Sequence, residues 1–160
     1  MSISEGSERP KRRGQIMLYA SLLIWIGVIF VFSSTQGSMS QTSRIIRPLL
    51  ELLFPTAPEE ILLFYHGIIR KLAHLTEYAV LGFLASRAVA GFYDGKLRGR
   101  SYVWAIVLVV LVAILDEMNQ SLNPARTGSM IDVLIDLTGG FIATLFYFLY
   151  WRQSSGKASI

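Results

Sequence analysis

The chain contains no cysteine, and this absence removes several kinds of chemistry. Without thiols there is no disulfide framework, no thiolate metal site and no thiol nucleophile. Charged residues are also scarce, at 16% of the chain, whereas a soluble domain has roughly 25%. Two familiar hydrolase signatures, the His-Glu-x-x-His zinc motif and the Gly-x-Ser-x-Gly elbow, are missing as well. Any catalysis must therefore use other groups and an unfamiliar arrangement.

Hydrophobic residues, in contrast, make up 52% of the chain and gather in long runs. The first predicted transmembrane span is 15–33, which is longer than the apolar region of a signal peptide and lacks its cleavage site. Further spans are predicted at 72–93, 101–119 and 130–151, and 22 residues rise roughly 33 Å, enough to cross a ~30 Å hydrocarbon core. The predicted fold class is all-α: a polytopic membrane protein with four transmembrane helices.

Two shorter apolar pieces, 45–54 and 61–69, lie between the first two predicted spans. Each is too short to cross the membrane, so we expect one or two amphipathic helices lying on its outer surface. The second piece has a plausible start, with Thr56 as the N-cap and Glu59 as its capping-box partner.

Positive charges are distributed unevenly around these spans. Ten of the fifteen Lys and Arg lie in the N-terminal tail, in the 94–100 loop with Arg87, or in the C-terminal tail, so these parts are predicted to face the cytoplasm. The basic residues flank hydrophobic runs and form no face, which argues against a nucleic-acid partner. The predicted organisation is a cytoplasmic basic tail at 1–14, a membrane domain at 15–152 and a cytoplasmic tail at 153–160.

Ionisable side chains occur at matching depths in the last three predicted spans. At 1.5 Å per residue, Glu77, Asp116 and Asp136 each lie about 21–24 Å above the cytoplasmic boundary, inside the outer edge of the core. A second group follows one turn further out and consists of His74, Gln120 and Asp132. Charges at the membrane centre cost about 2.5–3.5 kcal/mol each on insertion scales, so several of them imply partners or a wet cavity.

Each polar piece also has a plain structural explanation. His74 would be a hydrogen-bonded helix residue, Asp116 and Glu117 a hydrated helix end, and Asp132 and Asp136 favourable charges near a helix N-terminus. Together, these explanations require the deep carboxylates and both histidines to collect on one side by chance. We therefore favour a polar cavity near the outer face, with either a structural or a functional role.

Four motifs resemble those of one family, and they occur in the expected order across most of residues 30–140. They are FSSTQGSMSQTS, RKLAHLTEYAVLG, DEMNQ and NPARTGSMIDVLIDLTGG. This set is similar to the VanZ-like integral membrane proteins, named for a teicoplanin-resistance accessory protein. The resemblance implies a multi-pass protein of a bacterial cell membrane with a role in the cell envelope, in some members in glycopeptide antibiotic resistance.

The resemblance also implies which positions are characteristic. In this sequence they are Ser34, Gln36, Lys71, His74, Glu77, Tyr78, Asp116, Glu117, Gln120, Arg126, Asp132 and Gly139. The chain departs from the family pattern at two places: Thr35 separates Ser34 from Gln36 where a contiguous Ser-Gln is common, and Asp136 stands where many members have Asn. The second departure adds a carboxylate to the polar cavity.

Two functions follow from this pattern. The first, which we favour because no catalytic signature is present, is binding of a membrane lipid, a lipid-linked cell-wall precursor or a lipoglycopeptide, in envelope homeostasis or teicoplanin-type tolerance. Its candidate binding residues are Ser34, Gln36, Lys71, Tyr78, Gln120, Arg126, Asp132 and Asp136. Oligomers are compatible with this function, and a transporter with four short spans would need them.

The second function is a membrane enzyme acting on an envelope lipid or a lipid-linked phosphate or saccharide. Its candidate catalytic residues are His74, Glu77, Asp116 and Glu117, because clustered carboxyl groups let one act as an acid and another as a base. The same oxygens suit a divalent cation such as Mg²⁺ or Mn²⁺. The candidate metal ligands are Glu77, Asp116 and Asp132.

Overall fold

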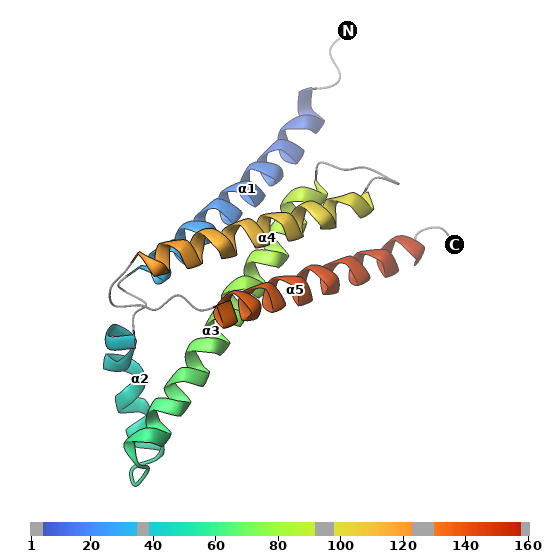
Figure 1. The fold of residues 1–160 in the computed structure, drawn as a ribbon. Helices are drawn as coiled ribbons and strands as arrows, with labels where there is room; N and C mark the ends of the chain where they lie inside the picture. Colours follow the sequence, from blue (N-terminus) through green and yellow to red (C-terminus); the bar gives the residue numbers. More distant parts are fainter. Residues whose placement is uncertain (1–4, 35–38, 92–97, 123–129, 158–160) are drawn as a thin grey trace.

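The computed structural model describes residues 5–34, 39–91, 98–122 and 130–157, and in these ranges the chain is helical, with no strand. The helices are α1 (Glu5–Ser33), α2 (Met39–Leu53), α3 (Glu59–Ala90), α4 (Arg98–Ser121) and α5 (Met130–Lys157). Helix α4 contacts both α1 and α5, and α3 crosses this group (Figure 1). The predicted all-α class is confirmed.

Three helices of the described chain, and not the four predicted, are long and apolar enough to cross a membrane. The three stretches are Gly14–Ser33, Arg100–Ser121 and Met130–Arg152. The predicted span 72–93 is not among them, because His74, Glu77 and Arg87 lower the hydropathy of that part of α3. The three spans turn many large apolar side chains outward, such as Leu23 and Phe146, as a lipid-facing surface requires.

Helix α3 also corrects the prediction of a separate surface helix at 61–69. That piece and the span predicted after it form one continuous helix of 32 residues, about 48 Å long at 1.5 Å per residue. No proline interrupts the helix. The predicted cap at Thr56 is wrong: Pro58 occupies the N-cap position without a side-chain cap, and Glu59 and Glu60 complement the helix dipole in the first turn.

The centre of the fold is the contact between α3 and α5. Helix α3 packs against all four other helices, most extensively against α5. A methyl group on Gly82 would collide with the backbone of Gly140, and one on Gly139 would collide with the backbone of Leu75. These small residues let the two backbones approach closely, as is common between membrane helices. Gly139, one of the characteristic positions, therefore lies in the closest helix contact of the described chain.

Helix α2 and the first part of α3 form a hairpin that projects from one end of the bundle (Figure 1). Helix α2 contains residues 45–53 of the apolar piece predicted at 45–54 and continues through Pro48. On the hairpin, Arg47 pairs with Glu51 at 2.8 Å and with Glu59 at 2.7 Å. Ile45 remains exposed, so the hairpin keeps an apolar outer side. Its position on a membrane surface stays a prediction.

Candidate functional site

The polar residues meet where α1 and α4 end and α5 begins, next to the middle of α3 (Figure 1). Because these ends lie at the same side of the bundle, residues far apart in sequence become neighbours. The meeting point holds Ser33 from α1, His74 and Glu77 from α3, Asp116 from α4 and Asp136 from α5.

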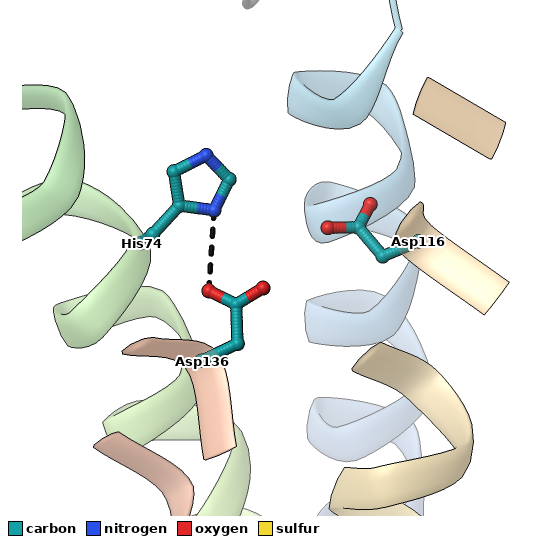
Figure 2. A group of neighbouring side chains, drawn as sticks. All are labelled: His74, Asp116 and Asp136. Carbon is teal, nitrogen blue, oxygen red and sulfur yellow. Dashed lines mark ion pairs between the residues drawn. The ribbon is translucent and has the colours of Figure 1, made fainter. Parts of the chain in front are cut away.

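Three of these side chains form a compact cluster, which we call the His-Asp-Asp cluster: His74, Asp116 and Asp136. One ligand atom from each lies within 4.8 Å of the others. His74 Nδ1 and Asp136 Oδ1 are 3.2 Å apart, and Asp116 faces this pair from the other side (Figure 2). The exposed fractions are 8%, 2% and 1%. The cluster is therefore a set of ionisable groups almost completely removed from solvent.

The Asp116 carboxylate is oriented by Gln120 and lies beside the buried hydroxyl of Tyr78. Its Oδ2 accepts a hydrogen bond of 2.9 Å from Gln120 Nε2, one helical turn further along α4. Its Oδ1 is buried and has no hydrogen bond of ordinary geometry within the described chain. Gln120 itself is 1% exposed, so its amide is shielded from bulk water and orients Asp116.

The end of α1 is fixed at the same place by hydrogen bonds of two of its side chains. Ser33 Oγ donates to the backbone oxygen of Asp116 at 3.3 Å and accepts from Asn119 Nδ2 at 3.2 Å. Two turns earlier, Trp25 Nε1 donates to the backbone oxygen of Glu77 at 2.9 Å. Trp25 and Asn119 were not among the predicted site residues. The eight-residue step from Trp25 to Ser33, which puts both on one helix face, was the available signal.

A cavity of about 80 Å³ opens beside the cluster, between α1, α2, α3 and α4. Its polar wall consists of Ser33, Thr42, Arg70, His74, Glu77 and Asp116, and its apolar wall of Ile29, Phe32 and Ala73. A single water needs roughly 10–15 Å³ by the same measure, so the cavity holds several waters or a small polar group. A polar cavity at this level was predicted, and α2 as part of its wall was not.

Helix α2 is fixed beside the cavity by the second histidine, His66, which is 3% exposed. Its Nε2 hydrogen-bonds Thr42 Oγ1 at 3.1 Å, and its Nδ1 lies 3.3 Å from Ser43 Oγ. Burial lowers the pKa of His66, and the positive charge of Arg70 lowers it further. Because Thr42 also lines the cavity, His66 connects the docking of α2 to the shape of the cavity.

The remaining candidate residues take different places. Tyr78 is fully buried next to the cluster, and Gly139 is packed against α3. Ser34, Lys71, Glu117 and Asp132 do not contribute to the cavity wall. Gln36 and Arg126 lie outside the described residues.

The structure thus favours a different carboxylate of α5 from the one we expected as a metal ligand. Asp136 faces His74, whereas Asp132 lies a turn earlier in the first turn of α5. The reason is the position at which the helices cross. Gly139 contacts Leu75, so Asp136, one turn before Gly139, meets His74, which precedes Leu75.

Comparison with known proteins agrees with the motifs. A family model described as VanZ/LLP1 matches residues 17–151. No curated protein matches, and neither does any solved structure. The matched residues run from α1 to α5 and include both the His-Asp-Asp cluster and the cavity. This membrane protein therefore belongs to the VanZ/LLP1 family.

Proposed function

We propose that the protein binds the polar headgroup of an envelope lipid or lipid-linked cell-wall precursor in the cavity between α1, α2, α3 and α4. The observation that carries this proposal is the composition of the cavity wall. It combines the guanidinium of Arg70 with the carboxyl groups of Glu77 and Asp116, at one end of three apolar helices. The proposed role is cell-envelope homeostasis.

The cavity wall suits a ligand with two kinds of polar group. Arg70 offers the geometry that binds phosphate oxygens, and the carboxylates accept hydrogen bonds from sugar hydroxyl or amino groups. The apolar wall includes Ile29 and Phe32, and Phe32 is 52% exposed, so an acyl or prenyl chain would leave the cavity along α1. A phosphate-bearing lipid matches all three features.

The positive-inside asymmetry supports an orientation with both termini in the cytoplasm and the cavity at the outer leaflet of a bacterial membrane. In this orientation α3 crosses the membrane as well, although it is less apolar than the three spans. There the exposed apolar side of α2, with Ile45 and Leu52, would also meet lipid tails or the tail of a lipoglycopeptide. The family resemblance supports a role in tolerance of teicoplanin-type drugs. Deleting the gene should then lower tolerance to a lipid-tailed drug more than to vancomycin, measured as inhibitory concentrations. Equal changes would argue against recognition of the tail.

Direct binding tests the headgroup proposal. Purified protein in detergent should bind a polyprenyl phosphate, detected by native mass spectrometry, and Arg70→Gln should weaken this binding at least about tenfold, because a charge-assisted contact is lost. The matched control is Lys71→Gln, which removes the adjacent charge from an exposed position outside the cavity wall. Equal binding by the wild type and both variants would contradict the proposal.

A second function, catalysis on the same lipid, is favoured by one observation. The Asp136 carboxylate orients the His74 imidazole beside a second carboxyl group, Asp116, an arrangement suited to general acid–base chemistry. Purified protein would then turn over a panel of lipid phosphates and lipid-linked saccharides, and Asp116→Asn would abolish turnover. If the wild-type protein binds the lipid without turnover, the catalytic function is refuted and only the binding function remains.

A further inference from the structure

The His-Asp-Asp cluster has more buried negative charge than the described chain neutralises. Asp116 and Asp136 are both at least 98% buried, and neither pairs with a Lys or Arg among the described residues. Asp136 Oδ1 lies 3.2 Å from His74 Nδ1 and has no hydrogen bond of ordinary geometry within the described chain. Buried carboxylates are costly unless a cation or a full set of hydrogen bonds compensates them. The cluster therefore calls for additional positive charge.

The unused oxygen of Asp116 points to where that charge belongs. Gln120 binds Oδ2 and leaves Oδ1, which is buried and without a hydrogen bond of ordinary geometry in the described chain. Figure 2 shows this carboxylate facing His74 and Asp136 across a short gap. An amide that fixes one carboxylate oxygen and leaves the other for a metal is a common outer-shell arrangement.

The spacing of the cluster is close to that of a metal site. With bonds of about 2.1 Å, ligand atoms lie about 3.4 Å apart in a tetrahedral site and up to about 4.2 Å apart when opposite each other. The three atoms of the cluster lie within 4.8 Å of one another, and His74 and Asp136 are already 3.2 Å apart. Small side-chain rotations would bring Asp116 to bonding distance, while the tight contact of Gly139 with Leu75 holds the backbones of α3 and α5.

We propose that His74, Asp116 and Asp136 together bind one divalent cation between α3, α4 and α5. One imidazole with two carboxylates lies between the all-oxygen sets of Mg²⁺ and Ca²⁺ and the nitrogen-rich sets of softer metals. This ligand set favours Zn²⁺ or Mn²⁺ over Mg²⁺ and Ca²⁺.

Such a cation would have open positions toward the cavity, because His74 and Asp116 belong to the cavity wall and Asp136 lies behind them. The oxygen of a phosphate headgroup would fit one of these positions, opposite Arg70. This last step rests on the proposed function. Cation binding itself does not, since all three ligands come from the chain.

The test uses the full chain, purified in lipid-free detergent with an affinity tag that contains no histidine, stripped by a chelator and titrated with Zn²⁺, Mn²⁺ or Mg²⁺ alone. We expect about one Zn²⁺ or Mn²⁺ per chain by elemental analysis, and at least about tenfold weaker binding of Mg²⁺ by calorimetry. Because no lipid is present, failure here leaves lipid binding untouched. If lipid binding persists in the presence of the chelator, it does not require the cation, and the two proposals can be judged separately.

Variants locate the cation. Asp136→Asn and His74→Gln should each weaken Zn²⁺ binding more than about tenfold, and Gln120→Ala should weaken it less. The control is Glu60→Gln, which removes an exposed carboxylate from the first turn of α3, fourteen residues before His74, and should leave binding unchanged. Circular dichroism and gel filtration check folding, and if Asp136→Asn does not fold, His74→Gln decides. The proposal is overturned if the wild type binds no stoichiometric cation or if His74→Gln binds as well as the wild type.

Discussion

The α3–α5 contact and the α2–α3 hairpin are held together by different forces. Helices α3 and α5 meet through glycine backbones, with no room for a methyl group at Gly82. The hairpin is held by the buried side chains of Leu50 and Leu62, by the polar contacts of His66 and by the exposed Arg47 ion pairs. Close packing does not respond to protons or salt, whereas buried imidazoles and exposed ion pairs do. We therefore expect a permanent centre and an adjustable hairpin.

The largest effect should come from Gly82→Ala. The added methyl group would collide with the backbone of Gly140, so α3 and α5 must separate, at a cost of about 2 kcal/mol or more. Thermal unfolding in detergent should show a clear loss of stability. The control is Gly67→Ala in the same helix, where nothing lies within 4 Å of the added atom and helix propensity predicts a gain of up to about 1 kcal/mol. If the two substitutions changed the unfolding temperature equally, the proposed difference in packing between Gly82 and Gly67 would be refuted.

A moderate effect should come from the protonation of His66. Its pKa is lowered in the folded chain, so the docked hairpin is fully stable above the unfolded pKa of about 6.5 and loses stability as the pH falls below it. The reason is that burial and Arg70 disfavour the imidazolium. Since the chain has no cysteine, spin labels can be placed on single cysteines at Ile45 and Phe64 to measure the distance between α2 and α3.

We expect that distance distribution to broaden between pH 7.5 and pH 5 in the wild type and to stay constant in His66→Gln. Hydrogen exchange around Gly82, two helical turns along α3 from the titratable His74, should show no change over the same range. A pH response that persists in His66→Gln would assign the effect to another group.

The smallest effect should come from Arg47→Gln. Arg47 bonds both Glu51 and Glu59, but all three side chains are about half exposed, and exposed ion pairs contribute little. We expect no measurable change in the unfolding temperature. If the ion pairs are the salt-dependent part of the hairpin, the distance between α2 and α3 should become insensitive to salt in this variant. A large loss of stability would instead show that the hairpin depends on the ion pairs.

The sequence predicted the helices, the level of the polar layer and the family, because these depend on local periodicity, helical rise and motif order. Glu77, Asp116 and Gln120 were placed from that rise alone. The pairing of His74 with Asp136 was not predicted, because it depends on the angle and register at which α3 crosses α5. The unbroken course of α3 was also missed, since short apolar pieces separated by Arg70 and Lys71 resemble two elements when hydropathy alone is read.

The unbroken course of α3 has a mechanical consequence. His66, which docks α2, and His74, which belongs to the His-Asp-Asp cluster, lie on one stiff rod only eight residues apart, about 12 Å along its axis. The rod has no proline or break between them. A lipid surface or a bound ligand that tilts the projecting hairpin would therefore also move His74, because α3 would pivot about its glycine contact with α5.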